Sequence, residues 1–111
     1  MITDLLAQRV MGWTRCPGRY LMENRRWIPD WRFQPLKNLE AALDLLSAAK
    51  PEFYTIEFRR RGLFTVRVQV GDIVGVATES SQALAVSYAV ARAIGIDPES
   101  PNTVKTAADL S

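Results

Sequence analysis

The fold is decided by residues 54–78, which read YTIEFRRRGLFTVRVQVGDIVGVAT. Apolar and polar side chains alternate in two runs of this stretch, Tyr54 to Phe58 and Phe64 to Val70. Alternation with a period of two is typical of β-strands that have one buried face. Arg60-Arg61-Gly62 predicts the first turn, and Gly71-Asp72 predicts a tight hairpin turn into a third strand. The stretch therefore predicts a three-stranded antiparallel sheet.

The turns also predict the register of these strands. With Phe58 opposite Phe64 and Val70 opposite Ile73, the apolar side chains share one face; the further pairs are Ile56 with Val66, Tyr54 with Val68, Val68 with Gly75 and Val66 with Ala77. The other face is polar apart from Val74 and Val76, so we expect cover on both sides of the sheet. The small residues Gly75 and Ala77 leave room for a helix to lie close.

Three helices are predicted around this sheet by apolar residues at helical spacing. The first covers residues 2–11 and ends at Gly12, which returns Trp13 toward the apolar face of the helix. The second opens after Pro35 and stops at Lys50-Pro51. The third is capped by Ser80 or Ser81 and runs over 82–94. It is apolar almost all round, so it is either buried or half covered by another subunit.

The expected architecture is α+β: a three-stranded antiparallel sheet with helices packed on it, as an α/β/α layered sandwich. Its order is α, a loop or short hairpin, α, β, β, β, α. The short hairpin would pair residues 20–22 with 26–28 around 23–25. We expect one domain over residues 1–97 and a flexible C-terminal tail over 98–111, which is polar and rich in small residues.

The composition fits a small intracellular protein. A chain of 111 residues with 48% hydrophobic and 23% charged residues can fold alone as one domain. The single cysteine, Cys16, cannot form an internal disulfide, which favours a reducing compartment. No apolar run approaches the roughly eighteen residues of a membrane span, and no signal peptide is recognisable. We therefore expect a cytoplasmic location and no membrane partner.

Between the first two helices lies an aromatic and basic stretch, residues 10–33. It holds all three tryptophans (Trp13, Trp27, Trp31) and five arginines (Arg15, Arg19, Arg25, Arg26, Arg32). We expect Trp13 to be a core residue, because a buried indole supplies much of a small core. Trp27 and Trp31 either pack on the scaffold or serve as anchors for a partner.

The arginines predict an anionic ligand or a solvated charged surface. Arg25 and Arg26 beside Trp27 could stack on and pair with a nucleotide or an RNA backbone, and Arg59-Arg60-Arg61 could hold phosphates. The net charge of only +2 makes an acidic protein patch or a small anion as suitable as duplex nucleic acid.

Catalytic chemistry has little support in the residues. The chain has no histidine, and Cys16 therefore lacks an imidazole partner. Glu40 and Asp44 are most simply the solvated face of the second helix, and no glycine-rich phosphate loop is present. We expect no enzyme activity, no cofactor and no metal site.

The order of these motifs resembles the phage ABA sandwich domain family. The resemblance spans roughly Ile2 to Gly95 and rests on Val10-Met11-Gly12-Trp13, the later Trp27 and Pro29, Phe33-x-Pro35, the leucine-rich helix, the meander and Ala93-Ile94-Gly95. It implies a layered α/β/α sheet and a bacteriophage or prophage origin. The family has no assigned catalytic residues to carry over. This chain departs from the pattern in its arginine-rich loop and in the basic turn 59–61.

Three functions follow as hypotheses. The first is a non-enzymatic phage accessory protein that inhibits a bacterial defence component, either by binding a host protein or by sequestering a nucleotide-like anion. Its site would be Arg25, Arg26, Trp27 and Trp31, with Arg59, Arg60 and Arg61 as an electrostatic adjunct. The second is an RNA or single-stranded DNA binding protein. The third is a structural homo-oligomer assembled through the last helix.

Overall fold

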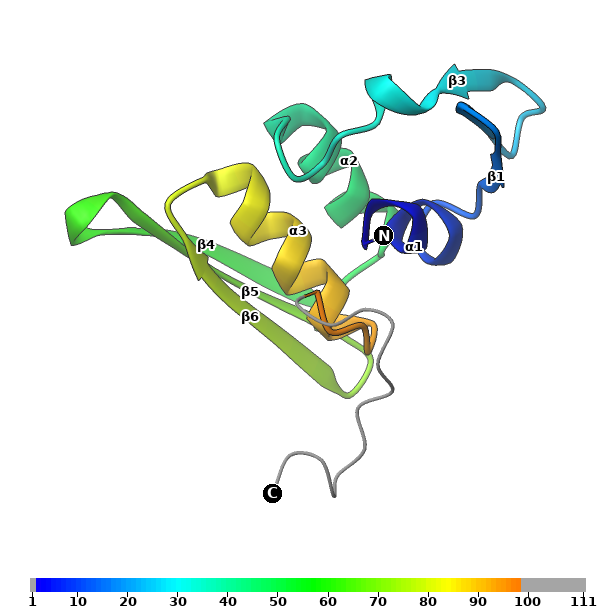
Figure 1. The fold of residues 1–111 in the computed structure, drawn as a ribbon. Helices are drawn as coiled ribbons and strands as arrows, with labels where there is room; N and C mark the ends of the chain where they lie inside the picture. Colours follow the sequence, from blue (N-terminus) through cyan, green and yellow to red (C-terminus); the bar gives the residue numbers. More distant parts are fainter. Residues whose placement is uncertain (1, 99–111) are drawn as a thin grey trace.

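The computed structural model describes residues 2–98 (Figure 1). The described chain contains three α-helices, two three-stranded antiparallel sheets and two short 3-10 turns. In chain order the elements are α1 (Ile2–Arg9), β1 (Thr14–Cys16), β2 (Arg19–Leu21), β3 (Trp27–Pro29), η1 (Asp30–Arg32), α2 (Leu39–Ala48), β4 (Phe53–Arg59), η2 (Arg60–Gly62), β5 (Leu63–Val70), β6 (Ile73–Glu79) and α3 (Gln82–Ala93). The predicted α+β class is confirmed. The predicted tail, apart from Pro98, lies outside the described residues.

The large sheet has the strand order β4-β5-β6 and the predicted register. Phe58 lies opposite Phe64, Val68 lies opposite both Tyr54 and Gly75, and Val70 lies opposite Ile73. The rings of Phe58 and Phe64 contact each other with centroids 5.1 Å apart. The alternation of side chains in the sequence therefore predicts which residues share a face of this sheet.

Helix α3 lies directly on β5 and β6, and Gly75 makes this approach possible. A Cβ atom placed on Gly75 would overlap the carbonyl oxygen of Ala89 and the backbone nitrogen of Ala93. The helix meets the sheet with small residues, since Ala85, Ala89 and Ala93 are all buried. The prediction that a helix packs closely at Gly75 is confirmed, and the helix is the last one.

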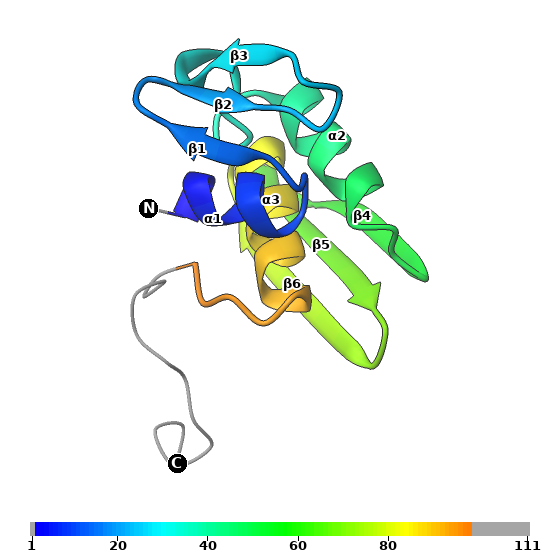
Figure 2. The same cartoon turned by 90° about the vertical axis from the view of Figure 1, so that its right-hand side faces the viewer.

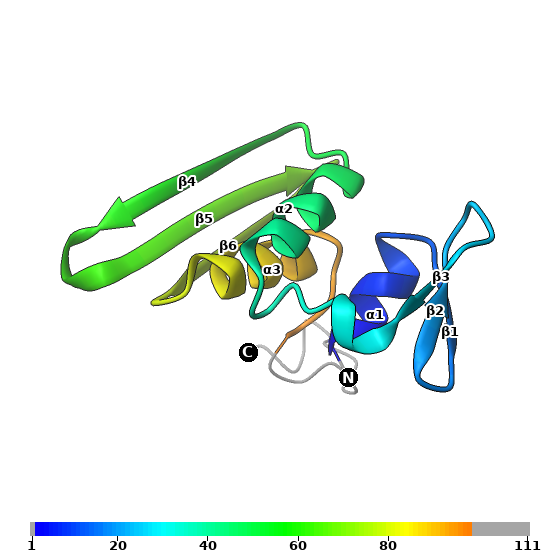
Figure 3. The same ribbon diagram turned by 90° about the horizontal axis from the view of Figure 1, so that it is seen from above.

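The remaining helices surround α3 on the side away from the sheet. Figure 3 shows α2 beside α3, and α1 between α3 and the small sheet β1-β2-β3; Figure 2 shows the same order from another side. Polar bonds add to these contacts: the Ser87 hydroxyl donates to the carbonyl of Pro35 at 2.7 Å, and the Arg92 guanidinium donates to the carbonyl of Val76 at 2.7 Å. The apolar circumference of α3 is thus buried within the chain.

Two details of the expected layering need correction. Among residues 2–98 the helices pack on one face of the large sheet, and the opposite face leaves Phe53 and Val74 exposed. The second layer was inferred from Val74 and Val76, but two isolated apolar residues do not require one. In addition, the surface of α3 that suggested a homo-oligomer is covered by the chain's own elements, so this helix offers no free apolar face for that hypothesis.

A glycine ends α1, and an asparagine side chain caps the beginning of α2. At the end of α1 Gly12 adopts a positive φ of 75°, and the N–H of Trp13 donates to the carbonyl of Ala7 at 3.0 Å, as expected of a glycine cap. Helix α2 begins at Leu39 rather than directly after Pro35. Its N-cap is Asn38, whose side chain accepts a hydrogen bond from the N–H of Ala41.

The aromatic and basic stretch forms a second, smaller sheet. The predicted pairing is confirmed, because β2 pairs with β3 and places Leu21 opposite Trp27. Strand β1 was not predicted, and it pairs with β2 through a turn at Pro17-Gly18. Strands of three residues are too short to show a clear alternation, which explains why the sequence pattern did not predict β1.

None of the helices in the described part of the chain is long and apolar enough to cross a membrane.

The contact at Gly75 predicts the largest local sensitivity of the fold. Gly75→Ala forces a methyl group against helix backbone that cannot rotate away, so we expect it to lower the free energy of unfolding by about 3 kcal/mol or more. Val74→Ala, on the neighbouring exposed position, should cost less than about 1 kcal/mol. Urea denaturation followed by circular dichroism measures both. Equal losses in the two variants would contradict the assigned contact.

Candidate functional site

Two turns connect the strands of the small sheet, and each contains one residue with a positive φ. Gly18 has a positive φ of 73° between β1 and β2. Between β2 and β3, Arg25 has a φ of 66°, and the side-chain oxygen of Asn24 accepts a hydrogen bond from the N–H of Arg26 at 3.0 Å. The turn therefore projects Arg25 and Arg26 from the tip of the hairpin, where both are exposed.

The inner face of the small sheet is part of the core. Tyr20 lies in the centre of this face and is almost fully buried. Its ring contacts those of Trp13 and Phe33 with centroids 5.9 and 6.0 Å apart, and Trp13 and Phe33 contact each other at 4.9 Å. The expectation that Trp13 is a core residue is confirmed. This aromatic cluster fixes the position of the small sheet on the molecule.

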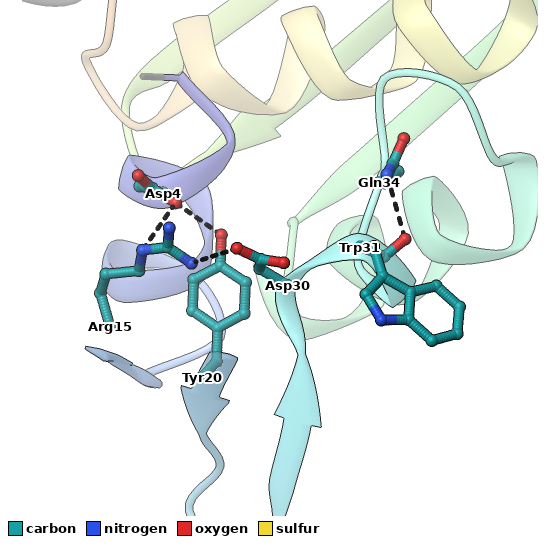
Figure 4. A network of polar contacts seen from close by, with 6 residues as sticks. All are labelled: Asp4, Arg15, Tyr20, Asp30, Trp31 and Gln34. Atoms are coloured by element: carbon teal, nitrogen blue, oxygen red, sulfur yellow. Dashed lines mark hydrogen bonds and ion pairs between the residues drawn. The ribbon is translucent and has the colours of Figure 1, made fainter. Parts of the chain in front are cut away.

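A polar network lies at the edge of this cluster (Figure 4). The Tyr20 hydroxyl donates to a carboxylate oxygen of Asp4 at 2.6 Å. The Arg15 guanidinium lies 3.6 Å from the same oxygen of Asp4 and donates to Asp30 at 3.1 Å. Burial, and after it the hydrogen bond to Asp4, raises the pKa of Tyr20 above its ordinary value of 10.0. The network joins α1, β1, β2 and η1, and no sequence signal predicted it.

The outer face of the small sheet is exposed and carries Trp27. Cross-strand pairing places Thr14, Leu21 and Trp27 in one row and Cys16, Arg19 and Pro29 in the next. Trp27 is 47% exposed, and the guanidinium carbon of Arg19 lies 3.9 Å from the centre of its ring. A cation stacked at this distance holds the indole in place while one of its faces stays open. We call Trp27, Arg19, Leu21, Arg25 and Arg26 the outer-face surface.

Trp31 lies on η1, directly after β3 in the chain, and is exposed. It is not part of the outer-face surface. Its carbonyl accepts a hydrogen bond from the side-chain amide of Gln34 at 3.0 Å, while its indole points away from the polar network (Figure 4). Trp31 lines two pockets, with volumes of ≈ 400 and ≈ 580 Å³. The first pocket is lined by Asp4, Arg15, Asp30 and Lys37, and the second by Trp13, Met22, Ile28 and Glu40 among others.

The structure separates the predicted site residues into two groups. Arg25, Arg26, Trp27 and Trp31 lie on or beside the small sheet, whereas Arg59–Arg61 lie at the far end of the β4–β5 hairpin (Figures 1 and 3). Arg59 is also engaged within the sheet, because its guanidinium donates to the Thr65 hydroxyl at 3.1 Å and to Glu57 at 3.3 Å. The two groups therefore cannot contact one small ligand together.

Arg19 and Leu21 belong to the outer-face surface but were not among the predicted site residues. Only the pairing of β2 with β3 places them beside Trp27, six to eight positions away in sequence. The described residues contain no cluster of three or more potential metal ligands from histidine, cysteine, aspartate or glutamate. Cys16, half-buried on the outer face, is a free thiol.

Comparisons with known proteins show the fold of this chain. No protein-family model matches it, and a search of curated proteins finds no match. Among solved structures, the chain is similar to a phage protein from Bacillus cereus ATCC 14579, known from a crystal structure at 2.0 Å. The superposition has a TM-score of 0.68 and covers 86% of each chain, with 15% sequence identity. At this identity the similarity shows a shared fold.

The buried hydroxyl of Tyr20 predicts a characteristic response to alkaline pH. Its pKa is raised on folding, so folding favours the neutral phenol; this contribution is complete below pH 10 and is lost as the pH rises further. Tyr20→Phe should lower the free energy of unfolding at neutral pH by about 1–2 kcal/mol and should flatten the alkaline loss of stability. Denaturation across this range, with tyrosinate absorbance, measures both. An unchanged alkaline profile in the variant would argue against the assignment.

Proposed function

We propose that the chain is a non-enzymatic accessory protein of phage or prophage origin that binds a protein of the bacterial host through the outer-face surface. The observation that carries this proposal is the arrangement of Trp27: a half-exposed indole on a paired strand, held by Arg19 and flanked by Leu21. Tryptophan and arginine are the residues most enriched at the energetic centres of protein interfaces. The surface offers both in a conformation that is already ordered.

Preorganisation supports binding by this surface. A side chain that is ordered only on binding costs about 0.5–1.5 kcal/mol of conformational entropy. Part of that cost for Trp27 falls on folding instead of binding, because β2–β3 pairing fixes its backbone and the Arg19 contact favours one orientation of its ring. Trp31 adds a second exposed indole beside two shallow pockets, which suits an apolar side chain of a partner better than an enclosed ligand.

The charges near Trp31 favour a protein partner over a sequestered nucleotide. The ≈ 400 Å³ pocket has the carboxylates of Asp4 and Asp30 in its lining. Its Arg15 guanidinium already pairs with both of these carboxylates. A phosphate entering this pocket would meet two carboxylates, Lys37 and an arginine that already pairs with both carboxylates, so the lining has no excess of positive charge.

Binding of RNA or single-stranded DNA is the second candidate. Trp27 with Arg25 and Arg26 nearby on an antiparallel sheet could stack one base and contact its phosphates. The separation of Arg59–Arg61 from this surface argues for a short contact rather than a long basic groove. Salt dependence separates the candidates, since nucleic-acid binding weakens steeply with added salt.

The host target we propose is a component of bacterial defence. The resemblance of the sequence to the phage ABA sandwich domain family and the structural similarity to a Bacillus cereus phage protein support a phage origin, from which we infer a target in the host. A small phage protein that binds through a preformed surface can act by covering the working surface of a host protein. Inhibition is accordingly proposed to occur by steric block, with no chemistry on the target.

Capture from host lysate tests the surface. Trp27→Ala should reduce recovery of a specific host protein about 30-fold or more, corresponding to about 2 kcal/mol for an anchor tryptophan. Ile73→Ala is the matched control, because Ile73 is 49% exposed on β6 of the large sheet and belongs to neither proposed surface. Native mass spectrometry before and after nuclease treatment identifies the bound species. If the added mass disappears after nuclease treatment, the partner is a nucleic acid and not a protein. If both variants reduce recovery equally, the assigned surface is wrong.

Phage growth tests the biological role. Expression of the native chain in bacteria that carry single defence systems should restore phage plating against at least one of them. The Trp27→Ala variant should fail to restore it, while Ile73→Ala should act like the native chain. Restoration by Trp27→Ala at matched protein levels would show that the outer-face surface is not the inhibitory one.

A further inference from the structure

Strand β4 leaves one edge of the large sheet open and exposes apolar side chains on both of its faces. Within residues 2–98 β4 pairs with β5 alone. Phe58 is 69% exposed, and Tyr54 on the same face and Phe53 on the other face are exposed as well. Helix α3 lies over β5 and β6 and not over β4. On the helix-side face of β4, Ile56 is therefore only half-buried, and Tyr54 and Phe58 are exposed.

An edge of this kind favours pairing with another strand. Its outward N–H and C=O groups have no ladder partner, and proteins usually protect such edges with charged side chains, above all lysine, with proline or with very short strands. The seven residues of β4, Phe53–Arg59, include neither proline nor lysine, and the two charges, Glu57 and Arg59, pair with each other at 3.3 Å. Three large exposed apolar side chains on one edge strand make an interaction surface the simplest explanation.

We propose that β4 pairs antiparallel with β4 of a second copy of this chain, centred on Ile56, so that the two large sheets join into one six-stranded sheet. In this register Ile56 lies opposite its own counterpart. Tyr54 lies opposite Phe58 of the second copy, and the symmetry repeats this aromatic pair. Every apolar residue on the helix-side face of β4 then has an apolar neighbour across the interface.

Charge complementarity supports the same register. Residues equidistant from Ile56 become neighbours along β4, and past the strand ends Glu52, just before β4, comes near Arg60 of the second copy, the first residue of η2. Both residues are exposed. A register centred on Glu57 would set two glutamates opposite each other, and one centred on Thr55 would set Phe58 against Glu52. The register on Ile56 groups the apolar residues on the helix-side face, and on the other face it sets Thr55 opposite Glu57 and Phe53 opposite Arg59.

A pocket at the start of β4 fits this arrangement. It has a volume of ≈ 630 Å³ and is lined by residues of α2 and of the segment entering β4: Leu43, Leu46, Ser47, Pro51, Glu52, Phe53 and Tyr54. Because Phe58 of the second copy lies opposite Tyr54, its ring comes to the edge of this pocket. Leu43, exposed on α2, would then gain apolar contact.

Sedimentation velocity of the native chain over a range of concentrations tests the proposal. We expect a reversible dimer and a dissociation constant at least about 30-fold weaker for Phe58→Glu, since the substitution places a negative charge against the Tyr54 ring and diagonal to Glu52 of the second copy. Ile73→Glu is the matched control: Ile73 is 49% exposed on β6, the other edge strand, and its substitution should leave the dimer intact. A native chain that stays monomeric at all concentrations would overturn the proposal.

Disulfide trapping tests the register with variants that keep the edge. In a Cys16→Ser background, Ile56→Cys should cross-link two chains on mild oxidation, because residues opposite each other in an antiparallel pair have Cβ atoms about 5 Å apart. Thr55→Cys and Glu57→Cys report the two neighbouring symmetric registers and should cross-link poorly. Preferred cross-linking at either of these positions, or a dimer that persists in Phe58→Glu, would contradict pairing centred on Ile56.

Discussion

The close approach of α3 to Gly75 is the contact on which the rest of the structure depends. Because the helix backbone of Ala89 and Ala93 meets the sheet where a Cβ atom would not fit, α3 lies deep against β6. A helix in that position is surrounded, and its apolar circumference becomes the centre of one core. The alanine content of α3 follows from the same constraint, since small side chains are needed wherever two backbones approach closely.

The small sheet depends on this core through aromatic and polar contacts rather than through shared strands. Trp13, Tyr20 and Phe33 pack against one another, while Asp4 and Asp30 hold Arg15 at the edge of the cluster. One face of a three-stranded sheet is thereby buried and the other remains exposed. Ile28, the next residue after Trp27, and its cross-strand partner Tyr20 point inward. Because successive strand residues point to opposite faces, Trp27 points outward and is exposed.

The two surfaces that we propose for interaction lie on different parts of the molecule. The outer-face surface belongs to the small sheet, and the open edge β4 lies away from it in all three views (Figures 1, 2 and 3). A dimer formed through β4 would leave both copies of the small sheet accessible. Such a dimer could engage two sites on an oligomeric target, where the second binding event benefits from a high effective concentration.

The sequence by itself determined the elements and register of the large sheet, the three helices and the burial of Trp13, because alternation, helical spacing and glycine turns are local patterns. It left open whether Trp27 and Trp31 pack on the scaffold, and the tertiary structure leaves both exposed. Tertiary structure alone decided that the helices pack on one face of the sheet, that Arg59–Arg61 lie far from Trp27 and that Arg19 stacks on its ring. These features depend on distances between residues remote in sequence, which no local pattern encodes. For the same reason the sequence did not predict the polar network of Asp4, Arg15, Tyr20 and Asp30, because its members come from four different elements.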